Sequence, residues 1–507
     1  MNKKQSILIV LLVVIILCTA CGPAAPQQTD TTAAPQTQAP QTTPAPETTA
    51  APETTAPETT AAAPQIAAID GKNTEFRILG RQHTNADATY NPYPEFAATA
   101  TTGEIMNDTV FKRNQALEDK YNIKIVADVD TRENVRNRLR TYVQTNDPYY
   151  DLVSIATMYA FTMASEGHLI STDKIPYVDL EKPWWHTQTM ENYTVGNIGY
   201  SLIGDINFSQ FLSAGALFFN QNVATEYKVP NMYDLVREGK WTVDQMHAIA
   251  KDITRDLNGD QAIDEQDMWG LVTGNFTWMN VFYGCDTGLI EKDENDIPVL
   301  VWNSERNLSI IDKITSLLND GEATMMSNQH PTWKTTTDDY LRANRALFRI
   351  GNIYTALSLR NMEPEFGILP MPKYNEAQEN YTTYTHYGHS NVMVVPKTNA
   401  RLDLTGAFLE DATYLSYKDL RPAFFEATLT GKIARNEDTV EMLNILFAGL
   451  NPDLALPFHG AGMTIDTVMR KIYTDDMDSY ASLLASEFTA NETAMKTNTE
   501  KLLNGNK

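Results

Sequence analysis

The chain has 507 residues, a formal net charge of −24 and 42% hydrophobic residues. So acidic a surface repels nucleic acid and anionic lipid headgroups, which excludes a nucleic-acid-binding protein. The length exceeds what one hydrophobic core normally spans, so we expect two lobes in the folded part.

Residues 1–21 have the features of an export signal. Two lysines precede an apolar run over 7–17, which is shorter than the roughly 20 residues that a membrane-spanning helix needs. The small residues before Cys21 resemble the bacterial lipobox, although Cys18 stands where that motif usually has Leu. We expect a mature protein that begins at Cys21 and is held at the extracellular face of the cell membrane by its lipid anchor only. The alternative is an ordinary secretory signal, in which Cys21 has no role.

Residues 22–65 form a low-complexity linker. They are almost only Ala, Pro, Thr and Gln, and the sequence APETT occurs three times. Such a segment has little apolar surface to bury, so we expect a disordered tether. The folded part, 66–507, contains a single cysteine, Cys285, and therefore no internal disulfide.

The start of the folded part has the pattern of a βαβ unit. A short β-type run covers Glu75–Leu79, and Asn107 and Asp108 are expected to cap the following helix. Apolar residues then alternate with polar ones over 122–125, as in a strand. A polar helix over 135–143 and a third strand over 151–155 follow. This alternation predicts a mainly parallel sheet with helices on both faces.

Helices interrupted by short strands dominate the C-terminal half. Thr242 and Gln245 form a capping-box pair before an apolar stripe at helical spacing. A further helix is predicted from Ser304 to Gly321, two more over 406–417 and 439–450, and a strand over 392–395. We expect the two lobes to exchange chain more than once.

Many short segments, taken in order, resemble the family 1 extracellular solute-binding lipoproteins of ABC importers. The resemblance covers 74–450 and includes Tyr121–Ile125, Tyr150–Val153, Pro183–Trp185, Gly204–Ile206, Leu217–Asn220, Gly239–Thr242, Gly367–Tyr374 and Val395–Lys397. It implies an α/β fold of the periplasmic-binding-protein-like type II, with two lobes, a hinge and an interlobe cleft. It also implies a small-molecule solute, of which a sugar is the expected class, and partner permease subunits.

Sugar receptors stack aromatic rings on a pyranose and satisfy its hydroxyls with polar side chains. Most of the seven tryptophans are expected to lie in the core. Loops after predicted strands, and polar turns within the resemblance, supply the candidate ligand-binding residues Arg81, Tyr159, Asp205, Trp278 and Tyr387.

The segment 256–267 resembles a dockerin-type calcium loop. Oxygen ligands at the spacing of such a loop come from Asp256, Asn258, Asp260, the carbonyl of Ala262, Asp264 and Asp267. Gln261 stands where the loop usually has Gly. A structural Ca²⁺ is one interpretation and an acidic, solvated turn is the other.

Three hypotheses for function remain open. The first is a monomeric binding protein, not an enzyme, that needs no cofactor for activity and closes its lobes on a neutral polar solute. The second is a wall-associated glycan-active enzyme, which needs a pair of carboxylates across a cleft. The third is a calcium-dependent adhesion module. No sequence motif for catalysis is present: His386 and His389 belong to no HExxH pattern, and GxSxG and phosphate-binding loops are absent.

Overall fold

The computed structural model describes residues 61–67, 69–82, 92–274, 277–330, 332–429, 437–459, 461–474 and 480–505. The predicted signal segment, Cys21 and the linker up to residue 60 lie outside these residues. Every helix within the described ranges is either too short or too polar to span a lipid bilayer.

The first of two main sheets is built from the predicted βαβ start. Its strands are β1 (Thr74–Arg81), β2 (Ile123–Asp130), β3 (Leu152–Ala156) and β11 (Asn391–Val394), in the order β11-β3-β1-β2. Strand β1 runs parallel to β2 and β3, whereas β11 is antiparallel to β3. The predicted strands are thereby confirmed, and a segment from far along the chain completes this sheet.

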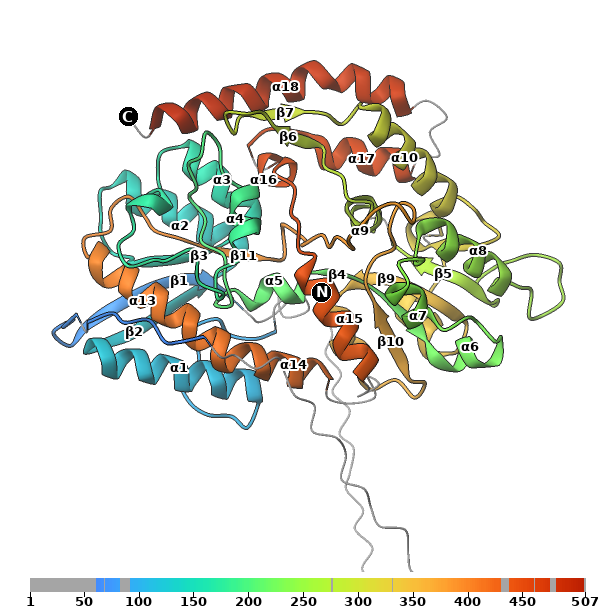
Figure 1. The fold of residues 1–507 in the computed structure, drawn as a ribbon, viewed down its shortest axis with the longest axis horizontal. Helices are drawn as coiled ribbons and strands as arrows, with labels where there is room; N and C mark the ends of the chain where they lie inside the picture. Colours follow the sequence, from blue (N-terminus) through green and yellow to red (C-terminus); the bar gives the residue numbers. More distant parts are fainter. Residues whose placement is uncertain are drawn as a thin grey trace, which may run out of the picture. The chain divides into compact units, whose positions relative to one another are not determined.

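Helices cover the first sheet (Figure 1, left). They are α1 (Ile105–Tyr121), α2 (Arg132–Gln144), α3 (Thr157–Ser165) and α13 (Leu402–Leu415). Helix α1 packs against β2 and α13, while α2 and α3 contact β3. This sheet with its helices is called the first lobe below.

The predicted start of α1 is wrong by three residues. The side chain of Glu104 caps the helix, because it accepts hydrogen bonds from the amides of Met106 and Asn107. Asp108 lies in the first turn and instead accepts hydrogen bonds from the amides of Thr102 and Gly103, at 2.7 and 3.1 Å. A carboxylate in the first turn stabilises the helix dipole, which explains its cap-like appearance in the sequence.

The second sheet has mixed strand directions (Figure 1, right). Its strands are β4 (Gly215–Asn220), β5 (Trp269–Thr273), β8 (Thr324–Met326), β9 (Ala346–Asn352) and β10 (Phe366–Leu369), in the order β10-β4-β9-β5-β8. Strand β4 is antiparallel to both of its neighbours, and β5 is parallel to β8 and β9. The expectation of a mainly parallel sheet therefore holds only in part.

The second sheet is surrounded by short helices and forms the second lobe with them. These helices are α6 (Gln221–Glu226), α7 (Met232–Arg237), α8 (Val243–Ile253), α9 (Trp278–Gly284), α10 (Glu305–Leu318), α11 (Thr337–Arg342) and α12 (Tyr354–Leu359). The predicted helix start at Ser304 is confirmed, because its side chain accepts from the amide of Asn307 at 3.2 Å. Of the predicted capping-box pair, the structure shows the hydrogen bond from the amide of Gln245 to Thr242, at 3.2 Å. A hairpin of β6 (Ile290–Lys292) and β7 (Pro298–Leu300) lies before α10.

The chain crosses between the lobes after β3, after β10 and again after α14 (Arg421–Leu429), since α14 packs against α1 of the first lobe and α15 (Glu437–Ala448) against β10 of the second. The remaining helices are α4 (Thr187–Asn192), α5 (Phe208–Leu212), α16 (Ala455–His459), α17 (Ile465–Thr474) and α18 (Tyr480–Gly505). The long α18 contacts α3 of the first lobe as well as α17 and β7 (Figure 1, top). Repeated exchange of chain between the lobes is thus confirmed.

Candidate functional site

A cavity of about 470 Å³ is lined by both lobes. The first lobe contributes Arg132 and Met158, which lie in the first turns of the helices after β2 and β3. The second lobe contributes residues that follow β5, β8 and β9. Ligands of open α/β sheets typically bind beyond the carboxyl ends of the strands, where loops bring polar side chains together. The volume lies in the range of small-molecule sites.

One crossover loop, 386–389, forms part of the cavity wall just before β11. The rings of His386 and His389 stack, with centroids 3.9 Å apart, and the ring of Tyr387 is stacked with that of His386 at a centroid distance of 5.4 Å. Burial lowers the pKa of His386 to about 4. Burial also lowers the pKa of His389, and the neighbouring His386 ring lowers it further. Both histidines are therefore neutral near pH 7, and the loop presents flat, uncharged rings.

Arg81, at the end of β1, holds this loop. It is buried, and its Nη1 donates to the carbonyls of Gly388 and His389, at 3.1 and 3.2 Å. Arg132 donates to the same Gly388 carbonyl at 3.2 Å. The first lobe thereby fixes a loop that the chain reaches only after crossing back from the second lobe.

Three arginines line the cavity. Arg132 pairs with Glu133 at 2.9 Å, Arg349 with Asp338 at 2.5 Å, and Arg470 with Asp466. Of their partners, only Asp466 lines the cavity, and it is the sole Asp or Glu among the described lining residues. The wall facing a ligand therefore has more cationic than anionic groups.

The sequence-predicted ligand residues are not brought together. Tyr387 lines the cavity, and Arg81 lies behind it as a support for the loop. Tyr159 lies outside the cavity lining, in α3, where its hydroxyl donates to Glu133 at 3.4 Å and Arg136 lies over its ring at 4.5 Å.

Asp205 and Trp278 also lie outside the cavity lining. Asp205 is 1% exposed and faces His186 at 3.5 Å and Arg421 at 3.8 Å. Trp278 is fully buried as the first residue of α9 and stacks on Tyr473 at 5.4 Å. Asp205 was predicted from a polar turn and Trp278 from its place after a strand, but both side chains are buried together with the apolar helices α5 and α9.

The aromatic lining consists of tyrosine and histidine. None of the seven tryptophans, all of which lie in the described part of the chain, lines the cavity, and six of them are buried. Tyr354 of α12 and Tyr387 supply the phenol rings instead. The expectation that most tryptophans pack in the core is confirmed.

Sequence reasoning missed two groups of lining residues. One is Arg349 to Asn352 at the end of β9, which the apolar run over 346–350 could have signalled as a strand. The other is Asp466 and Arg470 in α17, which lie one helical turn apart. No local pattern relates either group to the crossover loop, because tertiary folding alone brings them together.

The acidic loop over 256–267 turns as the calcium interpretation requires. Gln261 has a φ of 70°, the left-handed conformation for which such loops normally use Gly. Asp256 accepts hydrogen bonds from the amides of Gly259 and Gln261, at 2.6 and 2.8 Å. No described part of the chain holds three or more His, Cys, Asp or Glu side chains arranged to bind a metal ion. The site at Asp256, Asn258, Asp260, Ala262, Asp264 and Asp267 stays a prediction.

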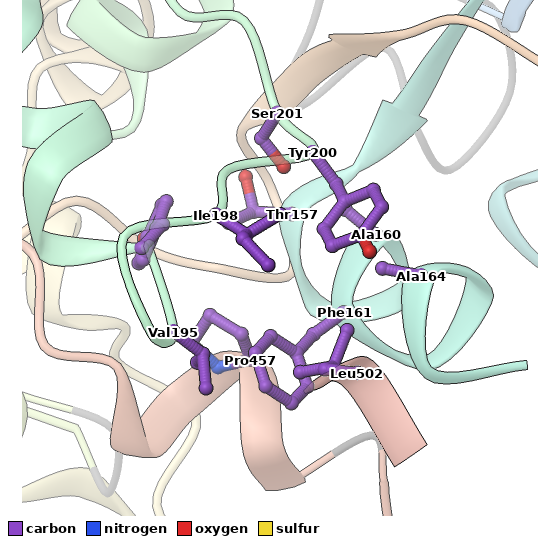
Figure 2. Close-up of a pocket in the computed structure, with 11 residues that line it drawn as sticks. Thr157, Ala160, Phe161, Ala164, Val195, Ile198, Tyr200, Ser201, Pro457 and Leu502 are labelled. Carbon is purple, nitrogen blue, oxygen red and sulfur yellow. The ribbon is translucent and has the colours of Figure 1, made fainter. Parts of the chain in front are cut away.

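A second cavity, shown in Figure 2, lies among Phe161, Pro457 and Leu502 and is mainly apolar. Its volume of about 20 Å³ is comparable to the space occupied by a single water molecule. A saccharide does not fit there, so this cavity is a packing defect between α3, α16 and α18.

The fold is shared with known structures. No protein-family model and no curated protein sequence matches the chain. A cyclic α-maltosyl-1,6-maltose-binding protein from Arthrobacter globiformis is 11% identical, with a TM-score of 0.55 over 84% of this chain and 99% of that one. A cyclo/maltodextrin-binding protein in complex with maltotetraose is 13% identical, with a TM-score of 0.54 over 86% and 98% of the two chains. An ABC substrate-binding protein from Listeria monocytogenes in complex with cycloalternan is 12% identical, with a TM-score of 0.52 over 85% and 98%. The predicted two-lobed α/β fold is confirmed.

Proposed function

We propose that this chain is the solute-binding lipoprotein of an ABC importer and that it captures an extracellular carbohydrate. The observation that carries the proposal is the 470 Å³ cavity, which both lobes line, in a fold shared with sugar-binding proteins of ABC importers. A ligand held by both lobes favours the closed arrangement, and permease subunits then distinguish the closed form from the open one. The chain acts as a monomer in this scheme.

The lining favours binding over glycan cleavage. Hydrolysis of a glycosidic bond ordinarily needs two carboxyl groups about 5 to 10 Å apart across the substrate. Asp466 is the only carboxylate among the described lining residues, and the arginine of the next helical turn already pairs with it. Hydroxyl-rich solutes instead match the amides, hydroxyls and guanidinium groups of the wall.

Calorimetric titration of the mature chain with a panel of oligosaccharides tests this function. We expect binding of at least one class with a dissociation constant in the micromolar range or tighter. Tyr387→Ala should weaken that binding, while Tyr177→Ala, which removes a tyrosine that is 49% exposed and absent from the cavity lining, should not. The proposal fails if no sugar binds while the chain is folded, or if both variants behave alike.

Lipidation of Cys21 is the second part of the proposal, and it rests on the lipobox-like residues before it. Two acyl chains hold a protein at a bilayer far more firmly than one, at about 0.8 kcal/mol per buried CH₂. In cells given an alkyne fatty acid, we expect label on the wild type and on Cys18→Ser, but not on Cys21→Ser. Label on the Cys21→Ser variant contradicts the assignment.

A further inference from the structure

The charge of the cavity wall opposes that of the whole chain. The chain carries a net charge of −24, whereas the described lining residues include three arginines and a single carboxylate. Two of the lining histidines, His386 and His389, have pKa values lowered by burial and stay neutral near pH 7. A ligand that enters this cavity therefore meets guanidinium groups in an otherwise acidic molecule.

Arg349 is the most firmly placed of these cations. Its Nε donates to Asp338 at 2.5 Å, and its Nη1 donates to the carbonyl of Ile350 at 3.1 Å and to the hydroxyl of Thr355 at 3.3 Å. Its Nη2 makes no hydrogen bond to any described residue, although the side chain is only 16% exposed. A guanidinium fixed along one edge thus keeps two N–H donors for the cavity.

Arg132 and Arg470 complete the cationic wall from other elements. Arg132 belongs to the first lobe, where its Nη1 donates to Gly388, and its side chain is 30% exposed. Arg470 belongs to α17, and its side chain is 37% exposed beside the buried Asp466. The carboxylates that pair with Arg132 and Arg349 lie outside the lining, so they hold these guanidinium groups without covering the side that faces the cavity.

We propose that the saccharide bound here carries an acidic group, a carboxylate or a sulfate, and that Arg349 binds this group while Arg132 and Arg470 face it. The inference rests on the proposed function and narrows its ligand to anionic saccharides. Planar guanidinium groups match the geometry of carboxylates and sulfates through paired hydrogen bonds. Each arginine already pairs with one carboxylate, but the lining itself holds three guanidinium groups and one carboxylate, so an anionic group gains more from this wall than a neutral hydroxyl does. The ligand proposed here is anionic, whereas the sequence analysis expected a neutral solute.

Paired ligands that differ only in charge test this inference in the mature chain. The probes are oligogalacturonides of two to four residues with their carboxyl-reduced counterparts, and sulfated carrageenan oligosaccharides of the same length with their desulfated counterparts. We expect one charged series to bind at least about 10-fold more tightly than its neutral counterpart, with a preference that falls as salt is added. The series that binds distinguishes a carboxylate from a sulfate ligand.

Two variants test whether the arginines of the cavity lining cause the preference for charged ligands. Arg349→Gln and Arg132→Gln should each weaken binding of the charged ligand about 10- to 100-fold and change binding of the neutral counterpart little. Arg140→Gln is the matched control, because Arg140 lies in α2 near Arg132 in sequence but pairs with Glu166 away from the cavity. Thermal melting shows whether each variant is folded, and the partly exposed Arg132 remains informative if Arg349→Gln fails to fold.

The outcomes separate the two proposals. Neutral sugars that bind as tightly as their charged counterparts overturn the inference and leave the proposed function standing. Silence in these series overturns the inference, and silence in the oligosaccharide panel as well overturns both proposals. An equal loss for charged and neutral ligands in the Arg349→Gln and Arg132→Gln variants overturns the assignment of the acidic group to these residues.

Discussion

Arg81 is a buried cation that lies behind the cavity wall and holds one of its loops. Its two hydrogen bonds hold the carbonyls of Gly388 and His389, next to the stacked rings of the cavity wall. Its own side chain is 5% exposed and lies outside the lining. Sequence reasoning predicted a ligand contact for this residue, whereas its position behind the lining favours a role in positioning the loop.

Replacing Arg81 by Lys should therefore affect both stability and binding. A lysine cannot reproduce the fixed geometry of the guanidinium donors, so buried carbonyls lose partners, at a cost of about 1 to 3 kcal/mol in the free energy of unfolding. We expect this loss in urea unfolding, together with weaker solute binding. Arg140→Lys, at an exposed ion pair, should change stability by less than about 0.5 kcal/mol. Equal effects of the two changes would contradict the positioning role.

Asp453 provides a residue-scale prediction for pH. Burial is the main cause that raises its pKa from 3.8 to about 6, despite hydrogen bonds from the amides of Leu289 and Ala455. Between these pH values the folded protein keeps a proton that the unfolded chain releases. The stability contributed by this group is therefore complete below about pH 4 and is lost as pH rises through about 6, a change of about 3 kcal/mol.

Asp453→Asn should remove that dependence. Measured by urea unfolding, the stability of the variant relative to wild type should increase from about pH 4 to about pH 7. Asp419→Asn, at an exposed aspartate, is the control for the loss of one carboxyl charge. A flat difference for Asp453→Asn would show that this carboxyl group is not perturbed as stated.

At the scale of elements, local signals explain which helices were predictable. Helix α10 has both a capping side chain, Ser304, and a buried stripe that includes Ile310, Ile311 and Ile314. Ser304→Ala should lower the free energy of unfolding by about 0.5 to 2 kcal/mol, because the amide of Asn307 loses its acceptor. Ser316→Ala in the same helix should cost less, since that hydroxyl bonds only to the carbonyl one turn back. Thermal unfolding of both variants measures the difference.

The predicted binding of Ca²⁺ by the loop over 256–267 can be tested by measuring stability with and without the ion. If the loop binds Ca²⁺ only when folded, saturation at about 100 times the dissociation constant should add about 2.7 kcal/mol to the stability and raise Tm. Asp260→Asn should reduce that gain, whereas Asp419→Asn should leave it unchanged. A Tm that does not respond to Ca²⁺ in the wild-type chain would favour the solvated turn.

Local pattern predicts elements well here, but it does not predict the site. Strands β1 to β3 and helices α8 and α10 follow from periodicity and capping, which act between residues close in sequence. Strand β8 has three residues, too few to carry a period, and its place in the sheet depends on β5. The lining residues Arg132, Arg349 and Arg470 belong to three separate elements. Only the folded arrangement relates them, so the sequence could not indicate the charge of the site.

At the scale of the whole molecule, the proposed function implies that the two lobes move relative to each other. The cavity is lined by residues from both lobes, so the lobe closure proposed above brings these residues together around a ligand. In small-angle scattering, a bound ligand should therefore decrease the radius of gyration of the chain. Tyr387→Ala should need more ligand for the same decrease. A radius that stays constant at ligand saturation would contradict closure.

The position of β11 has a consequence for how the chain is made. This strand, Asn391–Val394, pairs with β3 and contributes the edge of a sheet whose other strands end at Ala156. During translation, more than two hundred residues are synthesised between β3 and β11, and only then can the sheet of the first lobe be completed. A nascent chain released from the ribosome before residue 391 would leave β3 with an unpaired edge. Translation therefore begins with the first lobe, but all strands of the first lobe's sheet are present only after the second sheet has been translated.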